Sequence, residues 1–310
     1  MLRSQTAMTD LPLCRDSLDG LSVGDALGAQ FFVPGTTFQD LLDGTAPAGS
    51  WPWTDDTEMA LSLVAELHAD GHINQDRLAR RFAEHFEPYR GYGGGAVVIL
   101  RRIRNGEPWR DVTRDAFGGQ GSMGNGAAMR VAPLGAFHAG DTKTAALEAL
   151  RSAEITHAHA EGILGAVAVA VAAAEAGWAR LVRNRPTPAE LLDAVAGFLV
   201  DSQILTGVRR AKHLLRASVG EAAHELGNGT QILAQDTVPF ALWVAATHLD
   251  DYPAAIRACV EAGGDVDTTG AIVGGIVAAY TGRAGIPEAW LTQREPLAES
   301  GIGAGGAENR

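Results

Sequence analysis

The stretch EGILGAVAVAVAAAEA, residues 161–176, decides the fold class of this 310-residue chain. Its residues are apolar on nearly every side of a helix, which is typical of a helix buried in the middle of a protein. Because it is short and consists mostly of alanine and valine, it is a weak candidate for a membrane span. We therefore expect no membrane association and a central buried helix.

Segments with helical periodicity lie on both sides of this stretch. Within 57–70 the apolar residues repeat at the three- and four-residue spacing of one helix face. We expect Asp55 to cap this helix together with Glu58 in a capping box, and Gly71 to end it. No pair of segments resembles paired strands, so the fold class is predicted to be all-α. Further helices are expected over 78–86, 96–105, 188–201, 207–219, 236–249, 253–262 and 268–280, with a glycine-rich loop over 118–126.

Composition points to one globular domain. Hydrophobic residues make up 46% of the chain and charged residues 20%, which suits a protein with a substantial core. We expect the domain to span 13–295, with a flexible N-terminus at 1–12 and a disordered glycine-rich tail at 296–310. The two cysteines are too few for a disulfide scaffold, and no apolar secretory signal begins the chain. The expected location is therefore cytoplasmic.

The net charge of −12 restricts the possible partners. A protein that binds nucleic acid or a membrane surface without specificity needs a basic face, and this balance argues against one. A small anionic substrate is still compatible with the charge. Because a cleft holding several carboxylates would repel a pyrophosphate, such a substrate would require cations between the two.

Two acidic stretches carry the chemistry: WPWTDDTEMA at 51–60 and GGDVDTTGA at 263–271. Each has an apolar or glycine-rich start, two carboxylates, a threonine and then a helix. Carboxylate and hydroxyl oxygens are the ligands that Mg²⁺ and Mn²⁺ prefer, and no Cys/His set has zinc spacing. The candidate ligands are Thr54, Asp55 and Asp56 in the first stretch and Asp265, Asp267 and Thr268 in the second.

The same residues admit a simpler interpretation as helix caps. Asp and Thr in front of a helix are favoured by capping and by the helix dipole, and either stretch alone fits a cap equally well. Four carboxylates in two tight pairs exceed what capping requires. The repetition favours two divalent ions, which can orient substrate oxygens and supply a nucleophilic water.

Six motifs in order extend this reading over about residues 17 to 290. Together they resemble the ADP-ribosylglycohydrolase family, which includes dinitrogenase-reductase-activating glycohydrolase and the ADP-ribosyl-acceptor hydrolases. The resemblance implies a compact orthogonal helical bundle and, weakly, a monomer. The motifs are GLSVGDALG (20–28), WTDDTEMALSL (53–63), RGYGGG (90–95), GSMGNGAAMRVAPLG (121–135), THAHAEGILGA (156–166) and GGDVDTTGAIVGGIVAAYTG (263–282).

The resemblance also implies an activity and a site. The activity is hydrolysis of the N- or O-glycosidic bond between ADP-ribose and an acceptor, which is an ADP-ribosylated protein or small molecule. The cofactors would be two Mg²⁺ or Mn²⁺ ions on the six ligands named above, with Asp55, Asp56 and Asp265 positioning the attacking water. The implied ADP-ribose contacts are Gly93, Gly94, Gly95, Ser122, Met123, Gly124, Asn125 and His157.

Physical chemistry supports these contacts without requiring them. Glycines let backbone N–H groups approach a pyrophosphate closely, and Ser122 and Asn125 can donate hydrogen bonds to phosphate or ribose. The simpler alternatives are a plain flexible loop at 118–126 and a core histidine at 157.

One position departs from the family pattern. Many members carry a glutamate four residues after GDALG, where this chain has Phe32. A nearby carboxylate, Asp25 or Asp40, would have to replace it, or the metal-activated water would have to suffice. The alternative is a catalytically impaired homologue that only binds ADP-ribose. A phosphohydrolase with the same ions and a storage protein on the same fold are further alternatives.

Overall fold

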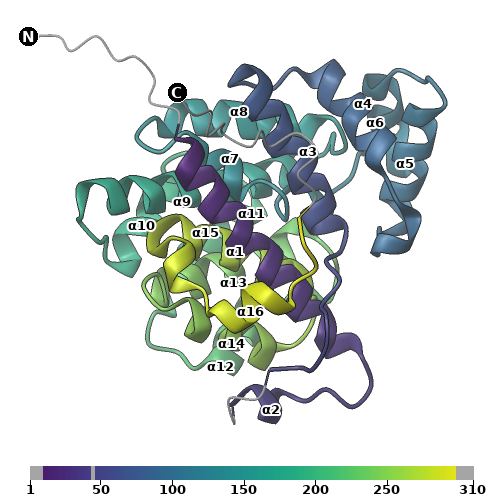
Figure 1. The fold of residues 1–310 in the computed structure, drawn as a ribbon. Helices are drawn as coiled ribbons and strands as arrows, with labels where there is room; N and C mark the ends of the chain where they lie inside the picture. The colour runs from purple at the N-terminus through teal and green to yellow at the C-terminus, as the bar shows by residue number, and fades with distance from the viewer. Residues whose placement is uncertain (1–9, 43–45, 298–310) are drawn as a thin grey trace, which may run out of the picture.

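The computed structural model of the chain describes residues 10–42 and 46–297, and every regular element in these residues is a helix (Figure 1). The all-α prediction is therefore confirmed. The α-helices are α1 (Leu11–Ala29), α2 (Phe38–Leu42), α3 (Asp55–Asp70), α4 (Gln75–His85), α5 (Gly94–Arg104), α6 (Trp109–Gly119), α7 (Ala132–Phe137), α8 (Thr142–Glu154), α9 (Ala160–Val182), α10 (Pro188–Ala196), α11 (Gln203–His213), α12 (Val219–Leu226), α13 (Ala234–Thr247), α14 (Tyr252–Ala262), α15 (Val266–Thr281) and α16 (Glu288–Gln293), with short 3₁₀ turns at Gln30–Phe32, Pro88–Arg90, Asn125–Ala127 and Arg283–Gly285.

Helix α9 is the central helix that residues 161–176 predict. It packs against α7, α8, α10, α13 and α15, and most of its residues are buried. By length and composition α9 could cross a membrane, but 78% of its most apolar window is buried inside the protein. This burial is what a core helix of a folded domain shows.

Helices α1 and α15 make the closest backbone contact of the fold. Gly20, Gly24 and Gly28 lie one turn apart on α1, and Gly24 and Gly20 face Gly270 and Gly274 of α15. A Cβ added at Gly24 would overlap the carbonyl oxygen of Gly270, so only glycine permits this approach. The pairing order shows that the two helices run antiparallel.

This contact brings the end of α1 to the start of α15. A Cβ at Gly28 would lie 2.6 Å from the carbonyl oxygen of Val266 and 2.7 Å from the Cα of Asp267. Two buried hydroxyls bond α1 to its neighbours further back along the helix. Ser17 Oγ donates to the Gly275 carbonyl at 2.8 Å, and Tyr252 Oη donates to the Gly20 carbonyl at 2.6 Å. The acidic start of α15 therefore lies against the GDALG segment.

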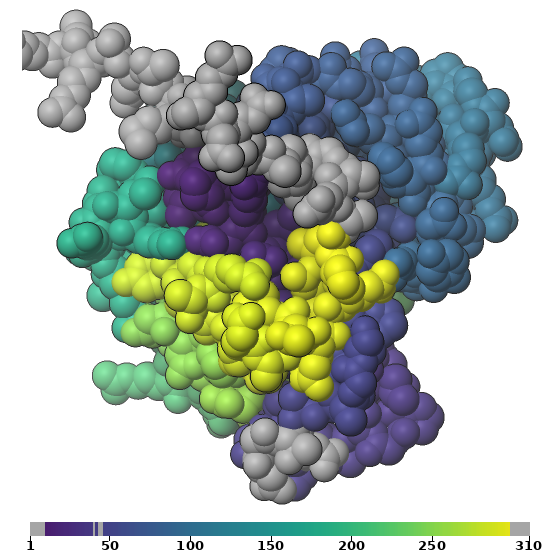
Figure 2. All heavy atoms as spheres, viewed as in Figure 1, coloured from purple at the N-terminus to yellow at the C-terminus, as the bar shows by residue number. Residues whose placement is uncertain are grey.

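Helices α4, α5 and α6 form a lobe, residues 75–119, beside the main body (Figures 1 and 2). The lobe is attached through buried carboxylates of the body. Glu66 of α3 accepts hydrogen bonds from Arg77 at 2.6–2.9 Å and from the Asn74 N–H at 3.1 Å. Glu148 of α8 accepts from the Ile73 N–H at 2.6 Å. Residues of α5 and α6, among them Gly94, Ile99 and Phe117, line one side of a pocket that the lobe shares with the body.

The structure corrects the predicted start of α3. Thr54, not Asp55, is the N-cap residue, and its own side chain accepts no hydrogen bond from the first turn. Asp55 is the first helical residue, so its side chain is not used in a cap. Glu58 makes tertiary contacts instead of closing a capping box. Gly71 ends the helix as predicted, with a left-handed φ of 71°.

Other boundaries differ because sequence periodicity is weak at helix ends. The predicted loop 118–126 is entered by α6, whose last turns contain non-helical backbone at 116–118. The segment 207–219 spans the end of α11 and the start of α12. Helix α1 starts at Leu11, two residues before the predicted domain boundary at 13. The N-terminal residues 1–9 and the tail from 298 lie outside the described residues, so most of the two predicted loose ends is not covered. Sequence periodicity did not predict α1, α2, α6, α7, α8 or α16, and it reached only the first residue of α12.

The glycine contact yields a stability prediction. We expect Gly24→Ala to lower the free energy of unfolding by about 1–3 kcal/mol, because the added methyl must push two backbones apart. The matched control is Gly220→Ala in α12, where an added Cβ meets nothing within 4 Å and helix propensity should be neutral or favourable. Urea unfolding of both variants measures the difference. Equal stability of the two would contradict the close-contact argument.

Candidate active site

The first acidic stretch is hydrogen-bonded to residues 293–295, at the end of α16. The Trp51 N–H donates to the Gln293 carbonyl at 2.7 Å, and the Glu295 N–H donates to the Trp51 carbonyl at 2.8 Å. Arg90 lies 3.5 Å above the Trp53 ring and donates to the Trp53 carbonyl at 2.9 Å. Both tryptophans are buried, which assigns them to packing rather than to a substrate surface.

Asp25 of α1 holds the start of α3. Its oxygens accept the Thr54 N–H at 3.0 Å and hydroxyl at 2.8 Å, and the Thr57 N–H at 3.2 Å and hydroxyl at 2.5 Å. The Thr54 hydroxyl also lies 3.0 Å from Asp56 Oδ2. A hydroxyl has one proton, so Thr54 donates to one of these two carboxylates at a time, and its oxygen lies beside both.

The second acidic stretch is positioned by two loops. The Asp265 N–H donates to the Asn228 carbonyl at 3.0 Å. Asn125 Nδ2 donates to Asp265 Oδ2 at 2.7 Å and to Thr237 Oγ1 at 3.1 Å. At the start of α15 the Thr268 N–H donates to Asp267 Oδ1 at 2.8 Å. The amide of Asn125 therefore orients a candidate metal ligand, a role that the sequence did not indicate.

The two stretches converge. Carboxylate oxygens of Asp25, Asp56 and Asp267 lie within 4.8 Å of one another. Asp56 is 1% exposed, and its Oδ1 has no hydrogen-bond partner among the described residues. Since a buried carboxylate oxygen requires a partner, this arrangement fits a divalent cation with oxygen ligands. Asp25 joins the cluster without having been a predicted ligand, although GDALG contains it.

Crowding changes the acidity of these groups. Burial, followed by the charge of Asp25, raises the pKa of Asp55 to about 8. Burial also raises the pKa of Asp25 to about 6, and it holds the pKa values of Asp56 and Asp267 well above their usual range. Without a cation the cluster therefore retains protons near neutral pH, whereas divalent ions would favour the ionised form.

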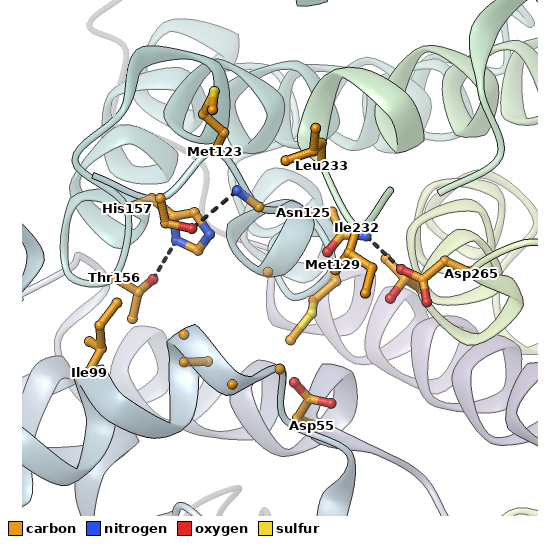
Figure 3. A pocket seen from close by; sticks show the side chains of 18 of the residues that line it. Asp55, Ile99, Met123, Asn125, Met129, Thr156, His157, Ile232, Leu233 and Asp265 are labelled. Carbon is orange, nitrogen blue, oxygen red and sulfur yellow. Dashed lines mark hydrogen bonds between the residues drawn. The ribbon is translucent and has the colours of Figure 1, made fainter. Parts of the chain in front are cut away.

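A pocket of about 500 Å³ opens beside this cluster. Figure 3 shows Asp55 and Asp265 toward one end and Thr156 and His157 toward the other. Of the six candidate metal ligands, every one except Thr54 lines this pocket. So does every predicted substrate contact: Gly93, Gly94, Gly95, Ser122, Met123, Gly124, Asn125 and His157. The structure thus brings together residues from the lobe, the body and both acidic stretches.

His157 belongs to a buried hydrogen-bond chain. Arg130, which is fully buried, donates to Thr156 Oγ1 at 3.0 Å, and Thr156 Oγ1 lies 2.7 Å from His157 Nδ1. Burial, and next the charge of Arg130, lowers the pKa of His157 to about 3, so the ring is neutral. With Nδ1 accepting from the threonine, its proton lies on Nε2 and faces the Gly124 backbone. His157 therefore supports the Ser122–Asn125 loop.

Two strained apolar residues frame the pocket mouth. Phe117 and Ile232 both line the pocket with φ of 53° and 57°, and they are 59% and 58% exposed. A left-handed backbone is unfavourable for bulky and β-branched residues, so the surrounding structure imposes it. The Phe117 ring covers Gly95, where an added Cβ would lie 2.5 Å from Cζ. Sequence periodicity carries no signal for such backbone strain.

The position of the missing glutamate lies away from the cluster. Phe32 is 55% exposed and does not line the pocket. Asp25 is fully buried, and both of its oxygens accept hydrogen bonds, so it is a positioning residue rather than a substitute base. The side chain of Asp40 lies outside the described residues. Among the described carboxylates, Asp55, Asp265 and Asp267 are the partly exposed ones that line the pocket.

Comparison with known proteins finds relatives over nearly the whole chain. The ADP-ribosylglycohydrolase family model matches residues 10–304. ADP-ribosylhydrolase ARH3 of Homo sapiens is 32% identical over 281 residues, covering 81% of this chain and 76% of that protein. An uncharacterised protein of Archaeoglobus fulgidus is 33% identical, covering 89% of this chain and 90% of that protein. A solved structure described as an ADP-ribosylglycohydrolase-related protein complex has a TM-score of 0.65 at 26% identity, covering 92% of each chain.

The raised pKa values predict how pH affects stability. In the metal-free protein Asp55 binds a proton up to a pKa of about 8, whereas the unfolded chain releases it near 4. The folded state therefore holds more protons in this window, and stability should fall as pH rises from 5 to 8.5. We expect Mg²⁺ to raise the thermal midpoint more at pH 8.5 than at pH 5. Thermal unfolding in EDTA and in Mg²⁺ tests this, and an equal rise at both pH values would contradict it.

Proposed function

Because this chain belongs to the ADP-ribosylglycohydrolase family, we propose that it is an ADP-ribosylhydrolase that uses two divalent ions, Mg²⁺ or Mn²⁺. It would cleave the N- or O-glycosidic bond between ADP-ribose and an acceptor. The observation that carries the proposal is the convergence of two acidic stretches, more than 200 residues apart, on the wall of one pocket. An isolated helix cap needs no such convergence.

The chain offers two sets of oxygen ligands to the proposed metal centre. Side chains of α3 supply one set and those of α15 the other, while Asp25 keeps the Thr54 hydroxyl in position. Divalent ions in such a site stabilise developing charge and make water a better nucleophile. The proposed ligands are Thr54, Asp55, Asp56, Asp265, Asp267 and Thr268.

The pyrophosphate would lie at the glycines that begin α5. Gly93 is the N-cap residue and Gly94 and Gly95 occupy the first turn, so their N–H groups are not used within the helix. An added Cβ at Gly93 or Gly94 would meet nothing within 4 Å, so the backbone is open to a ligand. The helix dipole adds a favourable field for an anion. Ser122 and Gly124 of the facing loop would contact the ligand from the body.

The distal ribose would then lie over the carboxylates. Glycosidic cleavage passes through an oxocarbenium-like state, and negative charge beside the sugar stabilises it. Asp55 and Asp265 reach the pocket and would orient the attacking water, with Asp56 behind them. With Phe32 in place of a glutamate, no described carboxylate on the segment after α1 takes a proton from this water. The metal centre would instead lower the pKa of this water, and the released proton would pass to solvent in the pocket.

Hydrolysis is tested directly with ADP-ribosylated arginine and serine peptides. We expect ADP-ribose to be released from one peptide class in Mg²⁺ or Mn²⁺ and not in EDTA. Asp56→Asn and Asp267→Asn should lower kcat/KM by about 100-fold or more, since each 1.4 kcal/mol of lost transition-state stabilisation is about tenfold in rate.

The matched control is Asp193→Asn, whose carboxylate is exposed and paired with Lys212 on the surface. It should leave kcat/KM unchanged. Measurable ADP-ribose binding without release from any peptide, with any metal, would instead support the impaired binding homologue that Phe32 suggests.

The apolar pair at the pocket mouth yields a binding prediction. A flat nucleobase stacks on an aromatic side chain with about 1–3 kcal/mol per base, so Phe117→Ala should weaken ADP-ribose binding about tenfold. Val98→Ala, on the exposed face of the same lobe, is the control and should leave affinity unchanged. Calorimetric titration with ADP-ribose measures both. Unchanged affinity in Phe117→Ala would show that the base binds elsewhere.

A further inference from the structure

Glu58 is a buried carboxylate that the proposed reaction does not use. It lies on α3 one turn after Asp55 and is 7% exposed. Its Oε1 accepts two hydrogen bonds from outside the helix: the Glu87 N–H at 3.0 Å and the Tyr92 hydroxyl at 2.6 Å. Neither bond caps α3, so the carboxylate serves a tertiary contact.

These two bonds hold both ends of one short segment. Glu87 begins and Tyr92 ends the stretch 87–92, which leads directly into the glycines that start α5. Tyr92 is 8% exposed, and its ring packs edge-on against Phe86 with centroids 4.7 Å apart. We call the stretch 87–92 the arch, because its first and last residues both donate hydrogen bonds to the same carboxylate of α3.

The middle of the arch bonds to the segment before α3 and to the segment after α16. Arg90 donates to the Trp53 carbonyl and forms a two-point ion pair with Glu295 at 2.7 and 2.8 Å. Gly91 has a φ of +98°, and an added Cβ there would lie 3.5 Å from Asp55 Oδ1. Gly91 of the arch therefore lies next to Asp55, a proposed metal ligand.

Placing Glu58 here carries a cost that packing alone does not explain. Glu58 is buried, and the carboxylates of Asp55 and Glu87 lie nearby. An apolar residue would fill the same space without desolvating a carboxylate. What an apolar residue would not provide is one acceptor that bonds both ends of the arch at once.

We propose that Glu58 and Tyr92 are positioning residues that fix the glycines at the start of α5 relative to the acidic cluster, and so set the affinity for the diphosphate of an ADP-ribosyl ligand. The inference rests on the proposed function, because it assigns the diphosphate to these glycines. Helix α3 carries both Glu58 and two proposed metal ligands. One rigid element therefore sets the spacing between the sugar and phosphate subsites.

Three variants separate positioning from simple stability. Tyr92→Phe removes the hydroxyl and keeps the ring, and Glu58→Ala removes the acceptor. Glu58→Gln keeps an oxygen that accepts both bonds but has no charge, so it should behave as a rescue. The control is Asp76→Ala in the same lobe, which loses the bonds from Trp109 and Arg110 away from the pocket.

Calorimetry with ADP-ribose and with Mg²⁺, and kcat and KM determined separately, are the measurements. We expect Tyr92→Phe and Glu58→Ala to weaken ADP-ribose binding and raise KM about tenfold, the effect of losing one hydrogen bond to a charged group. Mg²⁺ affinity and kcat should stay within about twofold of wild type. Glu58→Gln and Asp76→Ala should bind ADP-ribose as wild type does, even if Asp76→Ala melts earlier.

Two results would overturn the inference alone. One is wild-type ADP-ribose affinity in both Tyr92→Phe and Glu58→Ala, which would limit the pair to stability. The other is a loss of Mg²⁺ binding in Glu58→Ala, which would make Glu58 part of the metal centre. Failure of the wild-type protein to bind ADP-ribose would instead overturn the proposed function together with the inference. The readouts therefore distinguish the two failures.

Discussion

The close approach of α1 and α15 is the constraint on which the rest of the structure depends. Gly24 and Gly270 bring two backbones together where any side chain would separate them. Because of this approach, Asp25 near the end of α1 lies within reach of both the start of α3 and the start of α15. A larger residue at either glycine would move one acidic stretch away from the other. The packing of two apolar helices thus determines the geometry of a polar site.

The carboxylate cluster is in turn a source of instability that the fold tolerates. Asp25, Asp56 and Asp267 are gathered in a volume where burial disfavours their ionised forms. Threonine hydroxyls and N–H groups satisfy Asp25, but one oxygen of Asp56 is left without a partner. Natural proteins retain such costs mainly at functional sites, where cations or substrates supply the missing partner. The cluster is therefore best understood as half of a site that its ligands complete.

The pocket is formed by two parts of the chain, which contribute different kinds of residue. The body carries the carboxylates and the Ser122–Asn125 loop, while the lobe carries the glycines that begin α5 and the strained Phe117. The lobe is attached by ionic contacts at Glu66 and by the arch on Glu58. Such directional polar contacts fix orientation more sharply than apolar packing does. These contacts make the spacing between the glycines of α5 and the carboxylate cluster depend on a few hydrogen bonds at one end of α3.

The sequence by itself determined the fold class, the central helix α9 and the two acidic stretches, because apolar periodicity and residue chemistry are local properties. Motif order was sufficient to indicate the family, which the comparisons then showed. Local pattern did not reveal α1, whose mixed small and apolar residues give little periodicity, nor the use of Glu58 outside a capping box. Only the tertiary structure decided that Asp25 joins the cluster, that Asn125 orients Asp265, and that Phe117 and Ile232 stand at the mouth on strained backbone. These features depend on contacts between residues far apart in the chain, and no local pattern encodes such distances.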